Sequence, residues 1–514
     1  MSKFNTVKEG TKTKNLAGGV GYTEKAELEL ASLLMTTLLT DKFYEKEGDI
    51  LKRLDRLSKQ FLTTKEGIEF LAKASYYTRD KFKLRSISHY CSALLGKAIV
   101  ADLVPLDLKP LLKRYFEKVV MRGDDVTEII SAYSSINGAY RNSKGRVQLP
   151  RVMKIGLSNA VGNFDEYTVA KYKQSSKQTN LIDACRMIHA KHTAKNDEAL
   201  NKLMERGTVA NVNTWQSIQS KAGKAENTEQ AKVDGWREFL DKDRVEYFAL
   251  LRNLRNITNT QADELITKAC QILCDKDHIK RSRVLPFRFF TAYKLFERMN
   301  NSEIKAKHQK QVLSAISTAM SISIDNAPEF SGSTALLVDV SGSMNTPVSK
   351  GTTVADIASV FASALYKKNP DTDIILFNAD AQAIIPNPDD SLVTIAKTIG
   401  NYVGGGTDIS SAFEALNRKY DRIILLSDMQ SWLDSGLSYG RPNTLKTTYS
   451  RYKQKYKAKD TKLFSFDLEG YGTLAFPQDN VYCLAGFSDY VFDLMANLEV
   501  DKNYLVNDIK RVQL

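Results

Sequence analysis

The spacing of apolar residues changes once along this 514-residue chain, near residue 326. From residue 23 to about 320, apolar residues recur every three or four positions, as in ELELASLLMTTLLT (27–40). This spacing is typical of amphipathic helices. Segments of about 15–20 residues alternate with short polar breaks, which favours stacked antiparallel helix pairs of the HEAT-repeat type. We expect no strand before residue 330.

After the linker NAPEFSGS (326–333), continuous apolar runs alternate with amphipathic segments. The clearest runs are TALLVDV (334–340), TDIILFN (372–378) and RIILLSD (422–428). Such runs between helices indicate a parallel sheet covered on both faces, a doubly wound α/β fold. A ligand site in this fold lies beyond the carboxyl ends of the strands.

We therefore predict a multidomain chain: a flexible arm (1–20), an all-α repeat domain (21–325) and an α/β domain (326–514). No run of 18 apolar residues and no signal-peptide pattern is present in the sequence. We expect no membrane contact and a cytoplasmic location.

Charge is distributed unevenly between the two parts. Residues 331–514 carry 18 Lys/Arg and 21 Asp/Glu, so of the total net charge of +13 the first 330 residues carry +16. A basic helical region is a candidate binder of polyanions, although a lysine-rich solvated surface has the same composition.

Oxygen-bearing side chains gather where the predicted strands end. Asp339, Ser341 and Ser343 follow the first strand, Thr407 follows GGG before a helix, and Asp428 ends a third apolar run. These segments meet at one edge of a parallel sheet. Carboxylate and hydroxyl oxygens suit a hard cation, so we predict a divalent metal site, with Mg²⁺ as the ion.

Nucleotide hydrolysis and serine catalysis find no support in the sequence. No GxxxxGK[ST] loop is present, and all five histidines precede residue 309, before either serine of the proposed site. We therefore expect a protein that is not an enzyme.

The segments DVSGS, GGGT and LLSD resemble, in order, the three parts of the metal-ion-dependent adhesion site of von Willebrand A domains. The resemblance implies that Ser341, Ser343 and Thr407 bind the metal directly. It implies that Asp339 and Asp428 lie near the metal and contact it through water. In that family one coordination position stays open for an acidic group of a partner.

The helical region resembles the TROVE domain of the Ro ribonucleoprotein family. The matching segments include NLAGGVGY, FLAKASYYTRDKFKLRSISHY, LPRVMKIGLSNAVGNFDEYTVAKYKQ, LIDACRMIHAKH and VLPFRFFTAYKLF. This likeness spans residues 15–295, and a von Willebrand A domain follows the TROVE domain in that family. The resemblance implies a ring of HEAT-like repeats closed by the A domain.

The resemblance also implies a function. Family members bind small structured Y RNAs on the outside of the ring and single-stranded ends of misfolded RNA in its hole. They act in RNA quality control and processing beside nucleases, so an exoribonuclease is an implied partner.

Basic residues within these segments are candidates for neutralising phosphates. Lys171, Lys173 and His189 match family positions associated with RNA; Ser175 stands where the family has a basic residue, with Lys177 as a substitute. The full set of expected RNA contacts is Arg85, Arg151, Lys154, Lys171, Lys173, Lys177, Arg186, His189 and Lys191.

Two alternatives remain open. The chain could be a metal-dependent adhesion or adaptor module whose helical solenoid binds protein. It could also be a metal-dependent ribonuclease, although two carboxylates are few for a two-metal nuclease.

Overall fold

The computed structural model describes residues 12–14, 20–22, 26–36, 47–136, 147–172, 179–207, 223, 227–241, 245–327, 329–349, 351–428, 445–468, 480–485, 491–500 and 504–514. The chain divides into two compact units. The helical unit comprises residues 26–41, 46–217 and 503–514, and the mixed unit comprises residues 1–25, 42–45 and 218–502.

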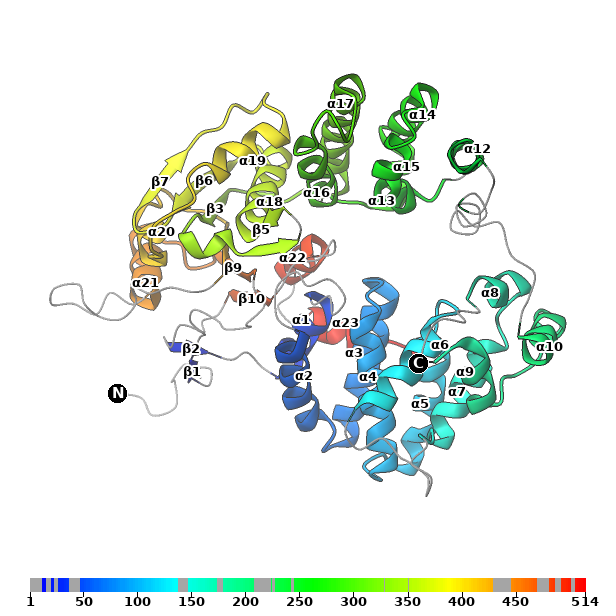
Figure 1. The fold of residues 1–514 in the computed structure, drawn as a ribbon. Coiled ribbons are helices and arrows are strands. Elements are labelled where there is room, and N and C mark those ends of the chain that lie inside the picture. Colours follow the sequence, from blue (N-terminus) through cyan, green and yellow to red (C-terminus); the bar gives the residue numbers. More distant parts are fainter. Residues whose placement is uncertain are drawn as a thin grey trace, which may run out of the picture. The chain divides into compact units, whose positions relative to one another are not determined.

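The helical unit is built from amphipathic helices that bury one apolar face each. Local sequence sets their ends: the Thr64 side chain, for example, accepts from the backbone N–H of Gly67 at the start of α3. Neighbouring helices such as α3 and α4, or α5 and α7, pack together as predicted for helix pairs (Figure 1). The helices are α1 (Ala26–Thr36), α2 (Glu47–Phe61), α3 (Lys65–Lys81), α4 (Ser86–Val100), α5 (Lys109–Lys118), α6 (Asp125–Ser135), α7 (Arg151–Val161), α8 (Glu166–Lys171), α9 (Leu181–Ile188), α10 (Asp197–Arg206) and α23 (Tyr504–Arg511).

Helix α23 comes from the other end of the chain yet packs on α1 and α3, as Figure 1 shows in red against blue. Leu505 and Ile509 are buried. Lys73 donates to the carbonyl oxygen of Lys510 over 2.8 Å, and the Lys510 ammonium pairs with Glu27 at 2.8 Å. The last residues of the chain are thus part of the core of the helical unit.

The mixed unit begins with further helices and ends with a sheet. Helix α16 packs on α17, and α14 also contacts α17. The helices before the sheet are α12 (Thr228–Leu240), α13 (Tyr247–Thr258), α14 (Asp263–Leu273), α15 (Lys276–Ser282), α16 (Pro286–Glu297) and α17 (Ala306–Ser323).

The sheet has the strand order β10-β9-β8-β3-β6-β7, and all neighbouring strands are parallel except β7, which runs antiparallel to β6. The central strand β3 is buried along its whole length. The strands are β3 (Thr334–Asp339), β6 (Thr372–Phe377), β7 (Ala381–Ile384), β8 (Arg422–Ser427), β9 (Lys462–Asp467) and β10 (Val481–Ala485), and the helices are α18 (Val354–Lys368), α19 (Leu392–Gly400), α20 (Ile409–Glu414), α21 (Leu445–Lys455) and α22 (Val491–Val500).

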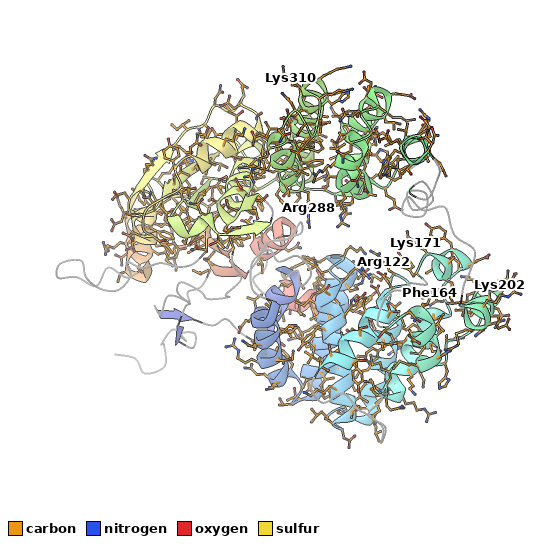
Figure 2. All side chains as sticks on the ribbon, viewed as in Figure 1. Arg122, Phe164, Lys171, Lys202, Arg288 and Lys310 are labelled. Carbon is orange, nitrogen blue, oxygen red and sulfur yellow. The ribbon has the colours of Figure 1, made fainter. Side chains whose placement is uncertain are left out.

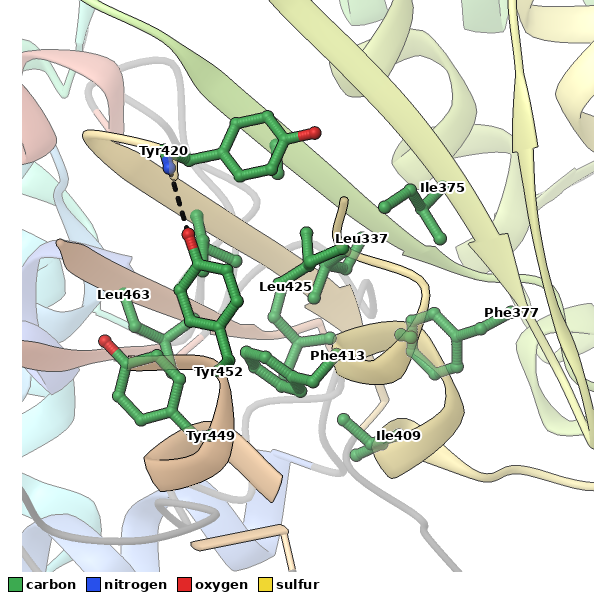
Figure 3. Packing of buried hydrophobic residues seen from close by; sticks show 14 of the residues in the cluster. Leu337, Ile375, Phe377, Ile409, Phe413, Tyr420, Leu425, Tyr449, Tyr452 and Leu463 are labelled. Carbon is green, nitrogen blue, oxygen red and sulfur yellow. Dashed lines mark hydrogen bonds between the residues drawn. The ribbon is translucent and has the colours of Figure 1, made fainter. Parts of the chain in front are cut away.

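Successive residues of each strand face opposite sides of the sheet. Leu337 and Leu425 pack with Phe413 of α20 and Tyr449 of α21 on one side (Figure 3). The Tyr452 hydroxyl accepts from the backbone N–H of Tyr420 over 2.9 Å and joins α21 to the start of β8. On the other side α18 packs against β3 and β6. Because helices cover both faces of the sheet, residues on both sides of the central strand β3 are apolar.

The helices before the sheet and the α/β domain share polar contacts. Lys294 of α16 pairs with Asp356 at 3.0 Å, and Asp356 also caps the start of α18. Lys397 of α19 pairs with Glu297 at the end of α16. Helices α16 and α17 therefore belong to the same compact unit as the sheet.

The predicted order of an α-helical region followed by an α/β domain is confirmed. The expectation of no strand before residue 330 is wrong, because β1 (Lys12–Lys14) pairs with β2 (Val20–Tyr22). Strands of three residues are too short to show a periodicity. The predicted domain boundary at 325/326 stays a prediction; the compact units place α12–α17 with the sheet and α23 with the first helices. In the described part of the chain, no helix is both long and apolar enough to span a membrane.

Candidate metal centre and candidate RNA interface

Asp339 is the last residue of β3, and its side chain is fully buried. Its Oδ1 accepts from the backbone N–H of Ser341 over 2.8 Å, and its Oδ2 accepts from the Ser427 hydroxyl over 2.6 Å. Ser427 ends β8, the strand beside β3. The carboxylate is therefore fixed between two neighbouring strand ends.

The two serines of this segment lie together. Their Oγ atoms are 3.1 Å apart, with Ser341 buried and Ser343 in the short helical turn Gly342–Asn345. Two hydroxyl oxygens at this spacing can face one ion.

The glycine-rich segment before Thr407 is held against the end of β3. Gly404 donates its N–H to the Val340 carbonyl over 2.7 Å, and Gly342 donates to the Gly405 carbonyl over 3.0 Å. Gly405 has φ of +81°, a backbone conformation that favours glycine. Thr407, buried, follows directly.

Asp428 comes directly after β8 and is also fully buried. Burial, and then the nearby charge of Asp428, raises the pKa of Asp339 to about 7. Two buried carboxylates with neighbouring hydroxyls are an oxygen-donor set that fits Mg²⁺. Among the described residues, no group of three or more His, Cys, Asp or Glu side chains is arranged to hold a metal ion, so hydroxyl oxygens would have to complete this donor set.

Several of the expected RNA contacts lie on α7, α8 and α9 of the helical unit. Arg151 begins α7, Lys171 ends α8, and Arg186 lies in the last turn of α9. The Ser158 hydroxyl of α7 donates to the carbonyl of His189 over 2.8 Å, which ties α7 to the end of α9. Lys154 is half-buried on α7, and Lys191 is exposed just after α9.

Arg85 lies elsewhere, at the start of α4. It forms 2.8 Å ion pairs with both Asp124 and Asp125, and about a quarter of its side chain (27%) is exposed. These two carboxylates give Arg85 a structural role in holding α4 to α6. Lys173 and Lys177 lie outside the described residues.

Two cations beside this surface were not singled out from the sequence. Arg122 and Lys195 line the same pocket as Lys171. They come from loops far apart in the chain, where helical periodicity carries no information.

The fold defines a class: helical repeats followed by a von Willebrand A-type sheet with an oxygen-rich strand edge. The TROVE domain model matches residues 26–234 and 206–328, and the Ro60 vWA domain model matches residues 334–498. The chain belongs to the TROVE-domain (Ro) family, which is a family of RNA-binding proteins.

The chain is also similar to solved and curated proteins. The Ro (RSR) protein of Deinococcus radiodurans shares the fold with a TM-score of 0.60 at 17% identity, covering 94% of this chain and 100% of that protein. Telomerase protein component 1 of mouse and of rat are each 22% identical over 320 residues, covering 46% of this chain and 11% of the relative. The chain thus spans about a tenth of the length of these two relatives.

Proposed function

We propose that this protein binds small structured non-coding RNA of the Y type, together with single-stranded ends of misfolded RNA, as part of RNA quality control. Family membership supports the RNA partner. The observation that carries the proposal is the set of cations on and beside α7, α8 and α9: α7 packs against α9, and Lys171 of α8 lines a pocket together with Ala160 of α7. Lysine and arginine neutralise phosphates without reading sequence.

These residues share a positive charge, and most of them are exposed, so they can contact the phosphates of an RNA backbone. Arg151, Arg186 and Lys191 are exposed, whereas Lys171 lies against the rings of Tyr167 and Tyr172. Aromatic rings beside cations are typical of sites for unpaired bases.

The proposal also gives a role to the metal centre. Ser341, Ser343 and Thr407 would hold Mg²⁺, with Asp339 and Asp428 nearby, and the ion would supply an attachment point for an acidic group of a partner protein. Nothing in this role requires hydrolysis. An exoribonuclease acting on the bound RNA is a proposed partner, and the cytoplasm is the proposed location.

Sequencing the RNA that co-purifies with the full-length protein tests this function. The expected result is enrichment of a few small structured RNAs, and that enrichment should fall in an Arg186→Gln/Lys191→Gln variant and persist in Lys202→Gln. Lys202 is a useful control because it lies on α10 and pairs with Glu198. Recovery of proteins without enriched RNA would favour the adaptor alternative instead.

A further inference from the structure

A pocket of about 610 Å³ opens between the loop that precedes α6 and helix α8 in the helical unit. A volume of several hundred Å³ is ordinary for a site that takes one small organic group. Arg122, Phe164 and Lys171, which are among its lining residues, are labelled close together in Figure 2. The proposed function uses Lys171 with the rings of Tyr167 and Tyr172, and the pocket adds Arg122, Phe164 and Lys195 to them.

The walls of the pocket combine rings with cations. The Arg122 guanidinium lies 5.5 Å from the centre of the Tyr172 ring, and the Lys171 ammonium lies 5.4 Å from the Tyr167 ring. Tyr167 is 45% exposed, which leaves ring surface for a ligand. Phe164, buried, forms the apolar floor.

The position of the Tyr172 ring depends on Gly123, which has no side chain. A Cβ atom added at Gly123 would lie 2.5 Å from Cδ2 of Tyr172, so only glycine allows the ring to lie against this loop. The wall of the pocket is thus set by a close approach between the loop before α6 and the end of α8.

The charge of the lining favours an anion. The lining contains three cationic side chains, Arg122, Lys171 and Lys195, and one carboxylate, that of Asp165. Asp165 is already engaged, since it accepts from the backbone N–H of Thr168 over 2.8 Å at the start of α8. Arg122 also pairs with Asp124 at 3.2 Å, which restrains its guanidinium.

We infer that this pocket receives one unpaired nucleotide of the bound RNA, with its base stacked on Tyr167 and its phosphate beside Lys171 and Lys195. The inference rests on the proposed function and adds to it. Backbone contacts alone do not distinguish a flipped-out base from a paired one. Stacking on an exposed ring does distinguish them, because only an unpaired base can leave the helix and place its flat face against the ring.

The test compares two hairpin RNAs of equal length and charge, one perfectly paired and one with a single bulged nucleotide, using the full-length protein. The bulged position carries 2-aminopurine, whose fluorescence falls on stacking. Wild-type protein should bind the bulged RNA about 10-fold more tightly and quench the probe. Tyr167→Leu should lose both effects, and Tyr167→Phe should keep them.

Lys202→Gln serves as the charge control, because Lys202 is absent from the lining of the pocket. It should leave the preference for the bulged RNA unchanged, whereas Lys195→Gln should lower the affinity for the bulged RNA. Tyr167→Leu that keeps the preference and the quenching would overturn the pocket assignment while leaving RNA binding in place. Wild-type protein that binds neither RNA would overturn the proposed function itself.

A final arm separates RNA from free nucleotide. Uridine or adenosine monophosphate, added in excess over the RNA, should compete poorly, because a single nucleotide lacks the contacts on α7 and α9. Competition by the monophosphate at equal concentration would overturn the assignment to a nucleotide within RNA.

Discussion

Asp339 and Asp125 are both fully buried carboxylates, yet their surroundings shift their acidity in opposite directions. Asp339 lies near a second carboxylate, and burial with that charge raises its pKa. Burial opposes ionisation of Asp125 as well, but the hydrogen bond with His89 and the charge of Arg79 hold its pKa well below its usual range. Arg79, Arg85 and His89 satisfy the charge of Asp125, whereas Asp339 accepts hydrogen bonds from the neutral groups of Ser341 and Ser427 at the site where we propose a metal ion.

Changing Asp339 to Asn should weaken Mg²⁺ binding by about 10-fold or more, because a nearby carboxylate that orients metal-bound water is lost. The helical unit should stay folded, since Asp339 belongs to the mixed unit. Isothermal titration calorimetry measures the affinity, with Asp389→Asn, an exposed carboxylate of the same domain, as the matched control. Unchanged Mg²⁺ affinity in Asp339→Asn would remove the metal assignment.

Replacing Asp125 by Ala should destabilise the helical unit by about 3–5 kcal/mol, because it leaves the buried Arg79 without its 2.8 Å partner. Asp80→Ala, which removes only surface pairs, should cost less than about 1 kcal/mol. Denaturant unfolding followed by circular dichroism measures both.

The acidity of Asp125 also sets a pH dependence. Its pKa is lower in the folded than in the unfolded state, so its contribution to stability is complete above about pH 4 and is lost as the pH falls below that value. The free energy of unfolding of the wild type should therefore fall more steeply below pH 4 than that of Asp125→Ala. Parallel curves for the two proteins would contradict the ionised, hydrogen-bonded state of Asp125.

Helices rather than single side chains determine which parts of the chain unfold together. Helix α23 is short, but Ile509 is fully buried. Changing Ile509 to Ala should destabilise the helical unit by about 2–5 kcal/mol and speed hydrogen exchange in α1 and α3. Asn507, exposed on the same helix, is the control, since Asn507→Ala should leave exchange in α1 and α3 as in the wild type. Faster exchange confined to α23 would show that this helix does not stabilise the unit.

The sequence predicts the elements better than it predicts their partners. Continuous apolar runs located β3, β6 and β8, and the ends of these runs located Asp339 and Asp428, because parallel strands end at one edge. Nothing in a helix with two buried residues indicates which distant helices it contacts, so the packing of α23 on α1 and α3 is evident only in the folded structure.

The same limit applies to Arg85 and to the pocket. Arg85 was selected as a cation within a matching segment, but its role depends on Asp124 and Asp125, which lie far along the chain and approach it only in the folded unit. Arg122 and Gly123 lie in a loop without periodicity, and only their distances to Tyr172 connect them to α8.

At the scale of the whole molecule, the excess of basic residues and the proposed metal centre belong to different parts of the chain. The first 330 residues carry +16 and the remainder −3. A polyanion is therefore expected to bind the helical part, and the proposed metal centre is expected to bind its partner independently of the RNA. Asp339→Asn should accordingly leave RNA affinity within about twofold of the wild type, a comparison made by fluorescence anisotropy at constant salt.

The salt dependence of RNA binding by the full-length protein tests the central claim most directly. Each neutralised phosphate contributes about −0.7 to −0.9 to the slope of log affinity against log salt. With roughly five cations on α7, α8 and α9 in contact, we predict a slope of about −4 and a loss of affinity of about 100-fold or more between roughly 50 and 200 mM salt. No binding at the lower salt concentration, or an affinity that does not change with salt, would contradict the account.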